Sequence, residues 1–415
     1  MFQRVFLHIK LLKRIFLLPI FFLVLISCRS ESDLPVEPDP ILRSRGALLK
    51  FEKTNEFSAE LIEQFLNSLT STQPVYLDAL YDVEIYKAVY LTKDYNGNIV
   101  EASGALFLPK GKDTLSVASI HHGTQTKRDR VGSVSPFYAP EGLASASLGY
   151  FTLVPDYLGL GESGIVHPYH HQKSSAEPVI DFIRAGREFA RKNNIVLNGQ
   201  IFLAGYSEGG FVTLAALKEI EQNYSNEITV AACAPMAGAY DLNLTAKTII
   251  QSGTYNQPSY LAYFLVAYNE IYGWNRLSDF FNSPYAENLP SLFDGTKTTD
   301  QINSQLTTDL SQLFKQNFIS SYLNGTETTV TQAFRENSLL NWVPSTPIRF
   351  YHGDADEYVP YENSVVAKNY FLSHGGNIDL VTIPGGTHGS SVLPSILGAI
   401  EWFETIRLNK YFSLR

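Results

Sequence analysis

Short apolar segments that alternate with helical stretches are the feature that most constrains the fold of this chain. Such alternation is typical of a mostly parallel sheet with helices packed on its faces. The sequence therefore predicts an α/β fold with a mostly parallel central sheet flanked by helices. The predicted strands are Leu115–Ile120, Tyr150–Pro155, Gln200–Gly205, Ile228–Met236, Pro347–Tyr351 and Ile378–Ile383, and the helical stretches include Ala176–Lys192, Gly209–Gln222 and Val392–Leu408.

The segment before these strands has a different pattern. Val83–Leu91 and Ile99–Leu108 alternate apolar and polar residues and flank Asn96-Gly97, which predicts a β-hairpin. We expect the folded part to open with a helix over Ala59–Leu69. With 415 residues, of which 45% are apolar, the chain is long enough for a large core that carries an insertion.

The first 27 residues have the order of a secretory signal, in which basic, apolar and small residues follow one another. The apolar run Ile15–Ile26 is shorter than the about 20 residues that a membrane span requires. It ends in Leu25-Ile26-Ser27-Cys28, which resembles a bacterial lipobox and implies a mature chain that begins at an acylated Cys28. The alternatives are a plain signal peptide and an N-terminal anchor helix. The basic residues are Arg4, Lys10, Lys13 and Arg14.

Residues 28–42 are acidic and rich in proline, which is typical of a solvated tether between a lipid anchor and a domain. Loss of the four basic residues in 1–27 would change the formal net charge from −9 to −13, so no attraction to nucleic acid is expected. Cys233 would be the one cysteine left besides Cys28, and its apolar surroundings predict a buried strand residue. These features predict an exported lipoprotein of the bacterial cell envelope, in the outer membrane and facing either the periplasm or the surface.

Ser207 stands in a sharp turn between a strand and a helix, in Gly205-Tyr206-Ser207-Glu208-Gly209. This context is the one that a G-x-S-x-G nucleophile elbow requires. Glycine at 205 and 209 avoids a clash between side chains and the neighbouring backbone. The helix that follows favours negative charge at its N-terminus. Ser207 is therefore the predicted nucleophile.

Two further segments supply an acid and a base after predicted strands. Asp356 follows the strand that ends at Tyr351, and His388 follows the strand that ends at Ile383. The chain order Ser, Asp, His is that of α/β-hydrolases. Each residue lies past the carboxyl end of a strand, the edge at which open α/β sheets build their sites. We expect Ser207, His388 and Asp356 to form a catalytic triad.

Several residues compete for these roles. His374 precedes its strand and should lie at the wrong edge of the sheet. Asp354, Asp356 and Glu357 compete for the acid, and the pattern His-Gly-x-x-Asp-x-x-Val-Pro selects Asp356. Asp354 is then expected to order its loop, and Asp156 is expected to be structural.

An oxyanion hole requires two backbone N–H donors directed at the developing charge. The N–H of Glu208 is the expected first donor. The second should come from the loop His121-His122-Gly123-Thr124-Gln125, in which Gly123 permits close approach of the backbone. Thr124 and Gln125 are the candidates for this donor, and Thr124 is preferred.

His167, His170 and His171 could suggest a metal site. Pro168 separates them, and no carboxylate or cysteine stands at close spacing as a fourth ligand. A polar loop is the favoured interpretation, and neither a metal nor another cofactor is expected.

Four stretches together resemble secretory lipases of the α/β-hydrolase superfamily, and the resemblance covers most of residues 75–405. It implies an α/β-hydrolase fold and the hydrolysis of esters, often of acyl glycerols. It also implies a helical cap between the strand after the nucleophile and the strand before the acid, where the aromatic-rich interval 241–342 lies. The stretches are Ile120–Thr124, Val154–Gly161, Gly205–Gly210 and His352–Asp356.

The predicted domains are a signal peptide at 1–27, a tether at 28–42, a hydrolase core at 43–240 and 343–415, and a cap at 241–342. The predicted function is a serine esterase or lipase acting on a small-molecule or lipid ester, with a membrane anchor through Cys28. A serine peptidase similar to the prolyl oligopeptidase group, a glycan acyl esterase and an inactive binding protein are the alternatives. Turnover of an ester compared with a dipeptide would distinguish the esterase from the peptidase, and an esterase assay of the wild type would test the inactive binding protein.

Overall fold

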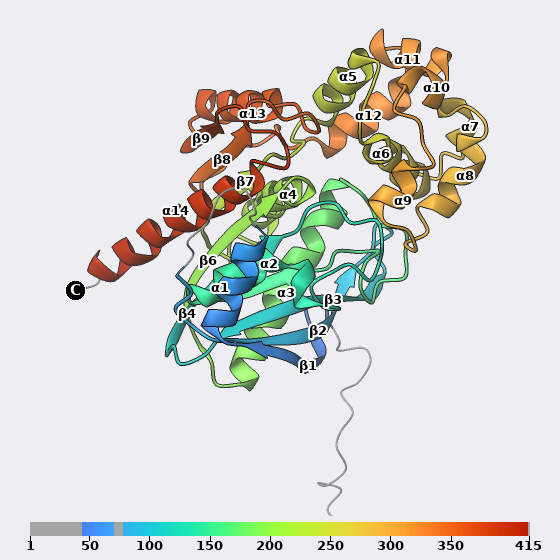
Figure 1. Ribbon diagram of the computed structural model, residues 1–415. Coiled ribbons are helices and arrows are strands. Elements are labelled where there is room, and N and C mark those ends of the chain that lie inside the picture. Colours follow the sequence, from blue (N-terminus) through green and yellow to red (C-terminus); the bar gives the residue numbers. More distant parts are fainter. Residues whose placement is uncertain (1–43, 70–77, 414–415) are drawn as a thin grey trace, which may run out of the picture. The chain divides into compact units, whose positions relative to one another are not determined.

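The computed structural model describes residues 44–69 and 78–413, and its centre is a sheet with the strand order β1-β2-β3-β5-β4-β6-β7-β8-β9 (Figure 1). Neighbouring strands from β5 to β9 are parallel, whereas β1, β2, β3 and β5 pair antiparallel. This arrangement confirms the predicted α/β fold, and the six predicted strands are β4 to β9. The bounds are β1 Leu48–Phe57, β2 Val83–Lys93, β3 Ile99–Pro109, β4 Thr114–His121, β5 Tyr150–Pro155, β6 Val196–Tyr206, β7 Val230–Met236, β8 Ile348–Gly353 and β9 Ile378–Ile383.

The predicted hairpin is present as β2 and β3, whose register runs without a break from Val83 to Lys93. Asp94 fixes the connecting turn, because its carboxylate accepts hydrogen bonds of 2.8 Å from the N–H groups of both Asn96 and Asn98. Gly97 adopts a φ of +84°, a conformation that glycine adopts at little cost. The Asn-Gly signal therefore identified the turn correctly.

The expectation that the folded part opens with a helix is wrong, because β1 precedes the helix α1 (Ala59–Ser68) and pairs with β2. β1 is an edge strand, and most of its residues are exposed or half-buried. Since only Leu48 of this strand is fully buried, its sequence lacks the apolar alternation that identifies half-buried strands.

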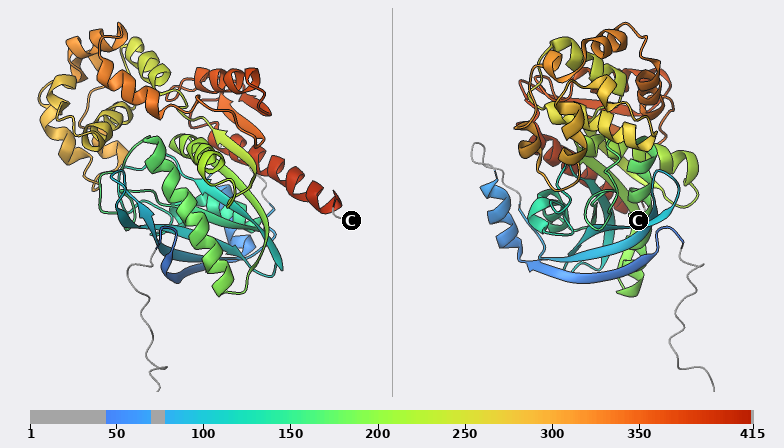
Figure 2. Two further views of the ribbon diagram at one scale, coloured as in Figure 1. Left: turned by 180° about the vertical axis from the view of Figure 1, so that it is seen from behind. Right: turned by 90° about the vertical axis from the view of Figure 1, so that its right-hand side faces the viewer.

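Two helical layers cover the two faces of the sheet, and each builds its own part of the core. Phe182 and Leu214 belong to the layer of α3, α4 and α13, whereas Leu143 and Phe403 belong to the layer of α1, α2 and α14. Figure 1 shows α1 and α2 in front of the sheet, and the view from behind in Figure 2 brings α3 and α4 forward. The bounds are α2 Pro140–Ser147, α3 Gln172–Lys192, α4 Glu208–Asn223, α13 Glu362–Ser373 and α14 Val392–Ser413.

Eight short helices, α5 to α12, fill the chain between β7 and β8. Their apolar side chains are continuous with the α3–α4 layer rather than a separate core. Tyr263 of α6, for example, stacks on Tyr169 with ring centroids 4.6 Å apart. The bounds are α5 Leu242–Ser252, α6 Pro258–Ile271, α7 Leu277–Phe280, α8 Tyr285–Leu292, α9 Thr299–Asn303, α10 Leu310–Leu313, α11 Gln316–Leu323 and α12 Thr328–Asn337.

The predicted signal peptide, Cys28 and the tether lie outside the described residues. Among the helices within 44–69 and 78–413, none combines the length and the apolar character that crossing a membrane requires.

Candidate active site

Ser207 occupies the turn between β6 and α4, at the carboxyl end of its strand. Its backbone is strained, with φ +61° and ψ −121°, a region that non-glycine residues rarely adopt. The flanking glycines make this turn possible. A Cβ atom on Gly205 would collide with the backbone of Gly209, and a Cβ atom on Gly209 would collide with the carbonyl of His121. Both positions therefore require glycine for the steric reason that the sequence predicted.

His388 follows β9 and lies beside Ser207, with 3.0 Å between His388 Nε2 and Ser207 Oγ. Its backbone is held from two sides. The carbonyl oxygen accepts a 2.7 Å hydrogen bond from the hydroxyl of Tyr206, and the N–H donates to Glu357 Oε2 at 3.0 Å. The position of this imidazole is thus fixed by residues next to the other two members of the predicted triad.

Asp356 lies in the loop after β8, and its side chain is fully buried. One carboxylate oxygen accepts hydrogen bonds of 2.8 Å from the N–H groups of Tyr358 and Val359. The other lies 2.7 Å from His388 Nδ1. Because an ionised carboxylate only accepts, Nδ1 carries the proton and Nε2 is free to accept from Ser207. The structure therefore brings the three predicted residues together in one hydrogen-bonded row.

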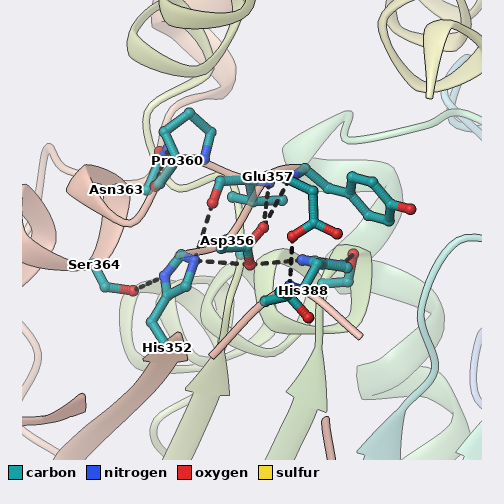
Figure 3. A network of polar contacts seen from close by, with 12 residues as sticks. His352, Asp356, Glu357, Pro360, Asn363, Ser364 and His388 are labelled. Carbon is teal, nitrogen blue, oxygen red and sulfur yellow. Dashed lines mark hydrogen bonds and ion pairs between the residues drawn. The ribbon is translucent and has the colours of Figure 1, made fainter. Parts of the chain in front are cut away.

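Sequence reasoning assigned no role to His352, which is buried at the end of β8. Its Nε2 lies 3.2 Å from Asp356 Oδ2 and 3.1 Å from the carbonyl of Val359, and its Nδ1 lies 2.8 Å from Ser364 Oγ (Figure 3). Nε2 faces two acceptors and must carry the proton, so Nδ1 accepts from the serine hydroxyl. The signal that could have indicated this role is the first residue of the His-Gly-x-x-Asp pattern.

The charge state of Asp356 follows from these contacts. Burial by itself would raise the pKa of the carboxyl, but hydrogen bonds from His352 and His388 outweigh burial and hold the pKa of Asp356 well below its usual range. The carboxylate thus stays ionised at neutral pH although water does not reach it.

The competing residues have other partners. Asp354 is exposed and accepts a 2.6 Å hydrogen bond from the N–H of Gly385, so it contacts the turn after β9. Asp156 is buried and accepts from Ser103 Oγ at 2.6 Å, in a structural role. His374 is exposed at the end of α13, away from Ser207. Cys233 is buried on β7, and burial raises the pKa of its thiol well above the usual value.

The loop after β4 lies against the nucleophile. A Cβ atom on Gly123 would be 3.6 Å from the carbonyl of Tyr206 and 3.8 Å from Ser207 Cβ. Gly123, Thr124, Ser207 and His388 all line one cavity of about 280 Å³. The hydroxyl of Thr124 is within hydrogen-bond distance, 3.0 Å, of the hydroxyl of Tyr169. The predicted oxyanion loop and the predicted nucleophile therefore share one cavity.

The three histidines of the 167–171 segment have separate environments. His167 lies between the carbonyl of Leu158, 2.7 Å from Nδ1, and Glu208 Oε1, 2.6 Å from Nε2. His170 packs on Phe211 and Phe264, and burial lowers its pKa to about 3. Within the described residues no group of three metal-ligating side chains comes together.

Glu208 is buried beside His167. Burial by itself would raise the pKa of this carboxyl, but the charge and the hydrogen bond of His167 outweigh burial and lower it. The pair anchors the first residue of α4, and the backbone N–H of that residue is the predicted oxyanion donor.

A family model described as secretory lipase matches residues 143–411, which include Ser207, Asp356 and His388. This chain belongs to the secretory lipase family. Relatives of this family member include the secreted triacylglycerol lipase LIP4 of Malassezia furfur, 24% identical over 238 residues, which are 56% of this chain and 43% of that lipase. Lipase 4 of Candida albicans is 24% identical over 54% of this chain and 47% of its own length. This secretory lipase family member thus spans about half the length of these two relatives.

Solved structures agree with the family and the fold. The rice cell wall degrading esterase LipA from Xanthomonas oryzae, in a ligand-bound form, superposes with a TM-score of 0.78 and 27% identity. The match covers 88% of this chain and 99% of that esterase. A Legionella pneumophila protein superposes with a TM-score of 0.82 and 26% identity over 86% of this chain and 98% of that protein. The α/β-hydrolase fold of this secretory lipase family member therefore extends over nearly the whole described region.

Proposed function

We propose that this protein is a serine hydrolase that cleaves carboxylic esters through Ser207, His388 and Asp356. The observation that carries the proposal is the row of contacts from Ser207 Oγ to His388 Nε2, at 3.0 Å, and from His388 Nδ1 to Asp356 Oδ2, at 2.7 Å. Membership of the secretory lipase family supports esters as the substrate class.

Each side chain has a defined part in the reaction. Ser207 Oγ attacks the ester carbonyl while His388 Nε2 takes its proton and then gives it to the leaving alkoxide. Asp356 keeps the proton of His388 on Nδ1 and stabilises the imidazolium that forms. Water, deprotonated by His388, then attacks the acyl-enzyme and releases the acid.

The negative charge on the carbonyl oxygen requires N–H donors. We assign these to the backbone of Glu208, at the start of α4, and of Thr124, with Gly123 leaving room for the approach. The position of Gly123 against Ser207 and the anchoring of Glu208 by His167 support this assignment. The helix N-terminus adds a favourable potential at the same point.

We assign helices α5 to α12 to a cap over the site. Three contacts support this role. Tyr260 of α6 lines the cavity that holds Ser207, and the hydroxyl of Tyr255 donates to the carbonyl of Tyr358 at 3.1 Å. Gln257 donates to the hydroxyl of Tyr358 at 3.0 Å. Tyr358 in turn packs on His388, with ring centroids 5.1 Å apart. The segment between α5 and α6, in which Tyr255 and Gln257 lie, thus contacts the loop that carries the acid.

We further propose that the protein is an exported lipoprotein, anchored by acylated Cys28 through the tether at 28–42. The order of basic, apolar and small residues before Cys28 supports export, and the secreted lipase among the relatives is in keeping with it. The membrane would then hold the enzyme close to lipid or cell-wall esters.

The decisive experiment compares the wild-type chain with Ser207→Ala on nitrophenyl butyrate, beside labelling with a fluorophosphonate probe. We expect ester turnover and covalent labelling in the wild type, and loss of both in the variant. Turnover of a dipeptide nitroanilide with no ester turnover would move the assignment to a peptidase, and absence of turnover and labelling in the wild type would indicate a binding protein. The similarity to the cell wall degrading esterase makes acetylated and feruloylated glycans the next substrates to compare.

A further inference from the structure

The C-terminal half of α3 carries a row of arginines on one face. Arg184, Arg187 and Arg191 follow one another at spacings of three and four residues, so their side chains leave the helix on the same side. From Gln172 to Arg191 the helix advances by about 28 Å, at about 1.5 Å per residue. The histidine segment beside Glu208 precedes the other end of α3, so the row lies well away from the catalytic groups.

The row borders a surface hollow of about 550 Å³ between α3 and the segment that leads into β1. Four arginines and one acid line this hollow, whereas the whole chain has 32 basic and 41 acidic residues. The acid, Glu188, already has partners. It accepts a 2.9 Å hydrogen bond from the N–H of Leu48 and lies 2.7 Å from Lys192 Nζ. The four arginines are Arg45, Arg184, Arg187 and Arg191.

Two of these arginines are neutralised by carboxylates behind the hollow. Arg45 Nε and Arg184 Nη1 lie 2.9 Å and 2.7 Å from the same oxygen of Asp181, whose side chain is fully buried. Arg45 also pairs with Glu177, and Arg184 pairs with Glu227. Such charge-assisted contacts fix both guanidinium groups, which therefore form a rigid wall of the hollow.

The other two arginines have no ion-pair partner within residues 44–69 and 78–413. Arg187 is half-buried and donates to the backbone carbonyl of Glu227 at 3.2 Å. Burial lowers the pKa of Arg187, and the nearby carboxylate of Glu227 does not offset this effect. The helix dipole stabilises a cation in the last turn of a helix, which accounts for Arg191. Arg187 lies before that turn, so the dipole does not account for its charge.

We propose that Arg187 and Arg191 bind a phosphate group in this hollow, here called the α3 anion site. Two guanidinium groups four residues apart on a helix can both reach one tetrahedral group, because its oxygens point in different directions. A phosphate monoester carries close to two negative charges at neutral pH, which matches the two unpaired arginines. A carboxylate has one charge and one plane, so it can meet only one guanidinium in bidentate geometry.

The size of the hollow favours a phosphate ester over the free ion. A volume of about 550 Å³ exceeds what one phosphate group fills, which leaves space for the group esterified to it. The wall formed by Arg45 and Arg184 is polar, so a substituent that carries hydroxyl groups suits it better than an alkyl chain. The site is independent of the proposed ester hydrolysis, because it contains none of the residues of the proposed triad.

Isothermal titration calorimetry on the full-length chain tests the α3 anion site, with glycerol 3-phosphate, inorganic phosphate and acetate as ligands. We expect a single saturable site for glycerol 3-phosphate, weaker binding of inorganic phosphate and no saturable binding of acetate. Equal affinity for the two phosphates would still support the site and would identify the free ion as its ligand.

Arg187→Gln and Arg191→Gln should each weaken the binding of glycerol 3-phosphate at least about tenfold, because each removes a charge-assisted contact. Arg187→Lys should keep only part of the affinity, since an ammonium group retains the charge and loses the planar fork. Lys173→Gln is the matched control. It removes one charge from an exposed position at the other end of the same helix, and its affinity should stay within about twofold of the wild type.

Thermal melts verify that each variant is folded. If the half-buried Arg187 cannot be replaced without unfolding, Arg191→Gln decides alone, because the side chain of Arg191 is exposed. Three results would each overturn the proposal. They are the absence of saturable binding of both phosphates in the wild type, binding of acetate as tight as that of phosphate, and an affinity of Arg191→Gln equal to that of the wild type.

Discussion

The imidazole of His352 lies 3.2 Å from the carboxylate of Asp356 and shares with His388 the same carboxylate oxygen. In Figure 3 the two rings lie on either side of that oxygen. His352 also donates toward the carbonyl of Val359, and the N–H of Val359 in turn donates to the carboxylate of Asp356. A second histidine thus positions the acid of the proposed triad, without contact to Ser207 among the described interactions.

Replacement of His352 should weaken catalysis through Asp356. We expect His352→Ala to lower kcat about tenfold to a hundredfold with little change in KM, because the carboxylate loses one of its donors and some of its orientation. The free energy of unfolding should fall by about 1–3 kcal/mol, since a buried charge loses a hydrogen bond. Ser364→Ala, which removes only the contact to Nδ1, is the control and should have a smaller effect on kcat. An unchanged kcat in His352→Ala would show that the contact does not serve the reaction.

Loss of the acid itself should be more severe. In Asp356→Asn the amide can donate to His388, so the imidazole would present its proton to Ser207 instead of a lone pair. We expect kcat to fall about 10⁴-fold on any ester that the wild type hydrolyses. Steady-state kinetics, with circular dichroism to verify the fold, measure the effect. A loss below about tenfold would point to another acid, with Glu357 the nearest candidate.

The low pKa of Asp356 also predicts how stability depends on pH. Because the folded-state pKa lies below the ordinary value of about 3.9, this carboxylate contributes stability that is fully present above that value and is lost as the pH falls through the folded pKa. Below about pH 4 wild-type stability should therefore decrease more steeply than that of Asp356→Asn, by up to about 1.4 kcal/mol per pH unit. Urea unfolding at pH 5, 4 and 3 compares the two. Parallel curves for wild type and variant would contradict the assigned direction of the pKa shift.

The sharp turn at Ser207 should not tolerate a side chain at 209. A Cβ atom there would collide with the backbone carbonyls of His121 and His122, which no rotamer change can relieve. We expect Gly209→Ala to cost several kcal/mol of stability or to displace Ser207, with kcat reduced at least about a hundredfold. Gly164→Ala, where no atom lies within 4 Å, is the matched control and should resemble the wild type. Thermal melts and ester turnover of both variants decide the matter.

The resemblance of Leu25–Cys28 to a lipobox predicts membrane attachment. The full-length protein expressed in a bacterium should partition into the detergent phase of a Triton X-114 extraction and incorporate labelled palmitate. Cys28→Ser should do neither and should keep its signal segment, because the sulfur that accepts the lipid is absent. Equal partitioning of wild type and Cys28→Ser would favour an anchor helix over acylation.

The sheet could be predicted from the sequence, and so could the hydrogen-bonded series of Ser207, His388 and Asp356, for one shared reason. Parallel strands place their carboxyl ends at one edge, so residues that follow β6, β8 and β9 are brought together whatever the chain length between them. The apolar segments of β6 and β8 are buried between two helical layers and are therefore conspicuous. β1 escaped prediction because only Leu48 among its residues is fully buried, so its sequence lacks a regular apolar alternation.

The role of His352 and the cavity beside α14 could not be predicted in the same way. In the sequence His352 is simply a residue near the end of a strand. Only the geometry of the following loop shows that its ring points toward Asp356. Along α14, Ile396 and Ala399 have the apolar character of any buried helix face. Sequence periodicity cannot distinguish a face that packs on the sheet from one that borders an empty space.

The hydrogen bond from Tyr206 to the carbonyl of His388 has a mechanical consequence. Tyr206 and Ser207 are neighbours in the chain. One dipeptide therefore fixes both the position of the loop that carries His388 and the position of Ser207 Oγ. The spacing between base and nucleophile is thus fixed within the strand end itself. If a bulky substrate displaced the helices α5 to α12, the distance between His388 and Ser207 should therefore stay the same.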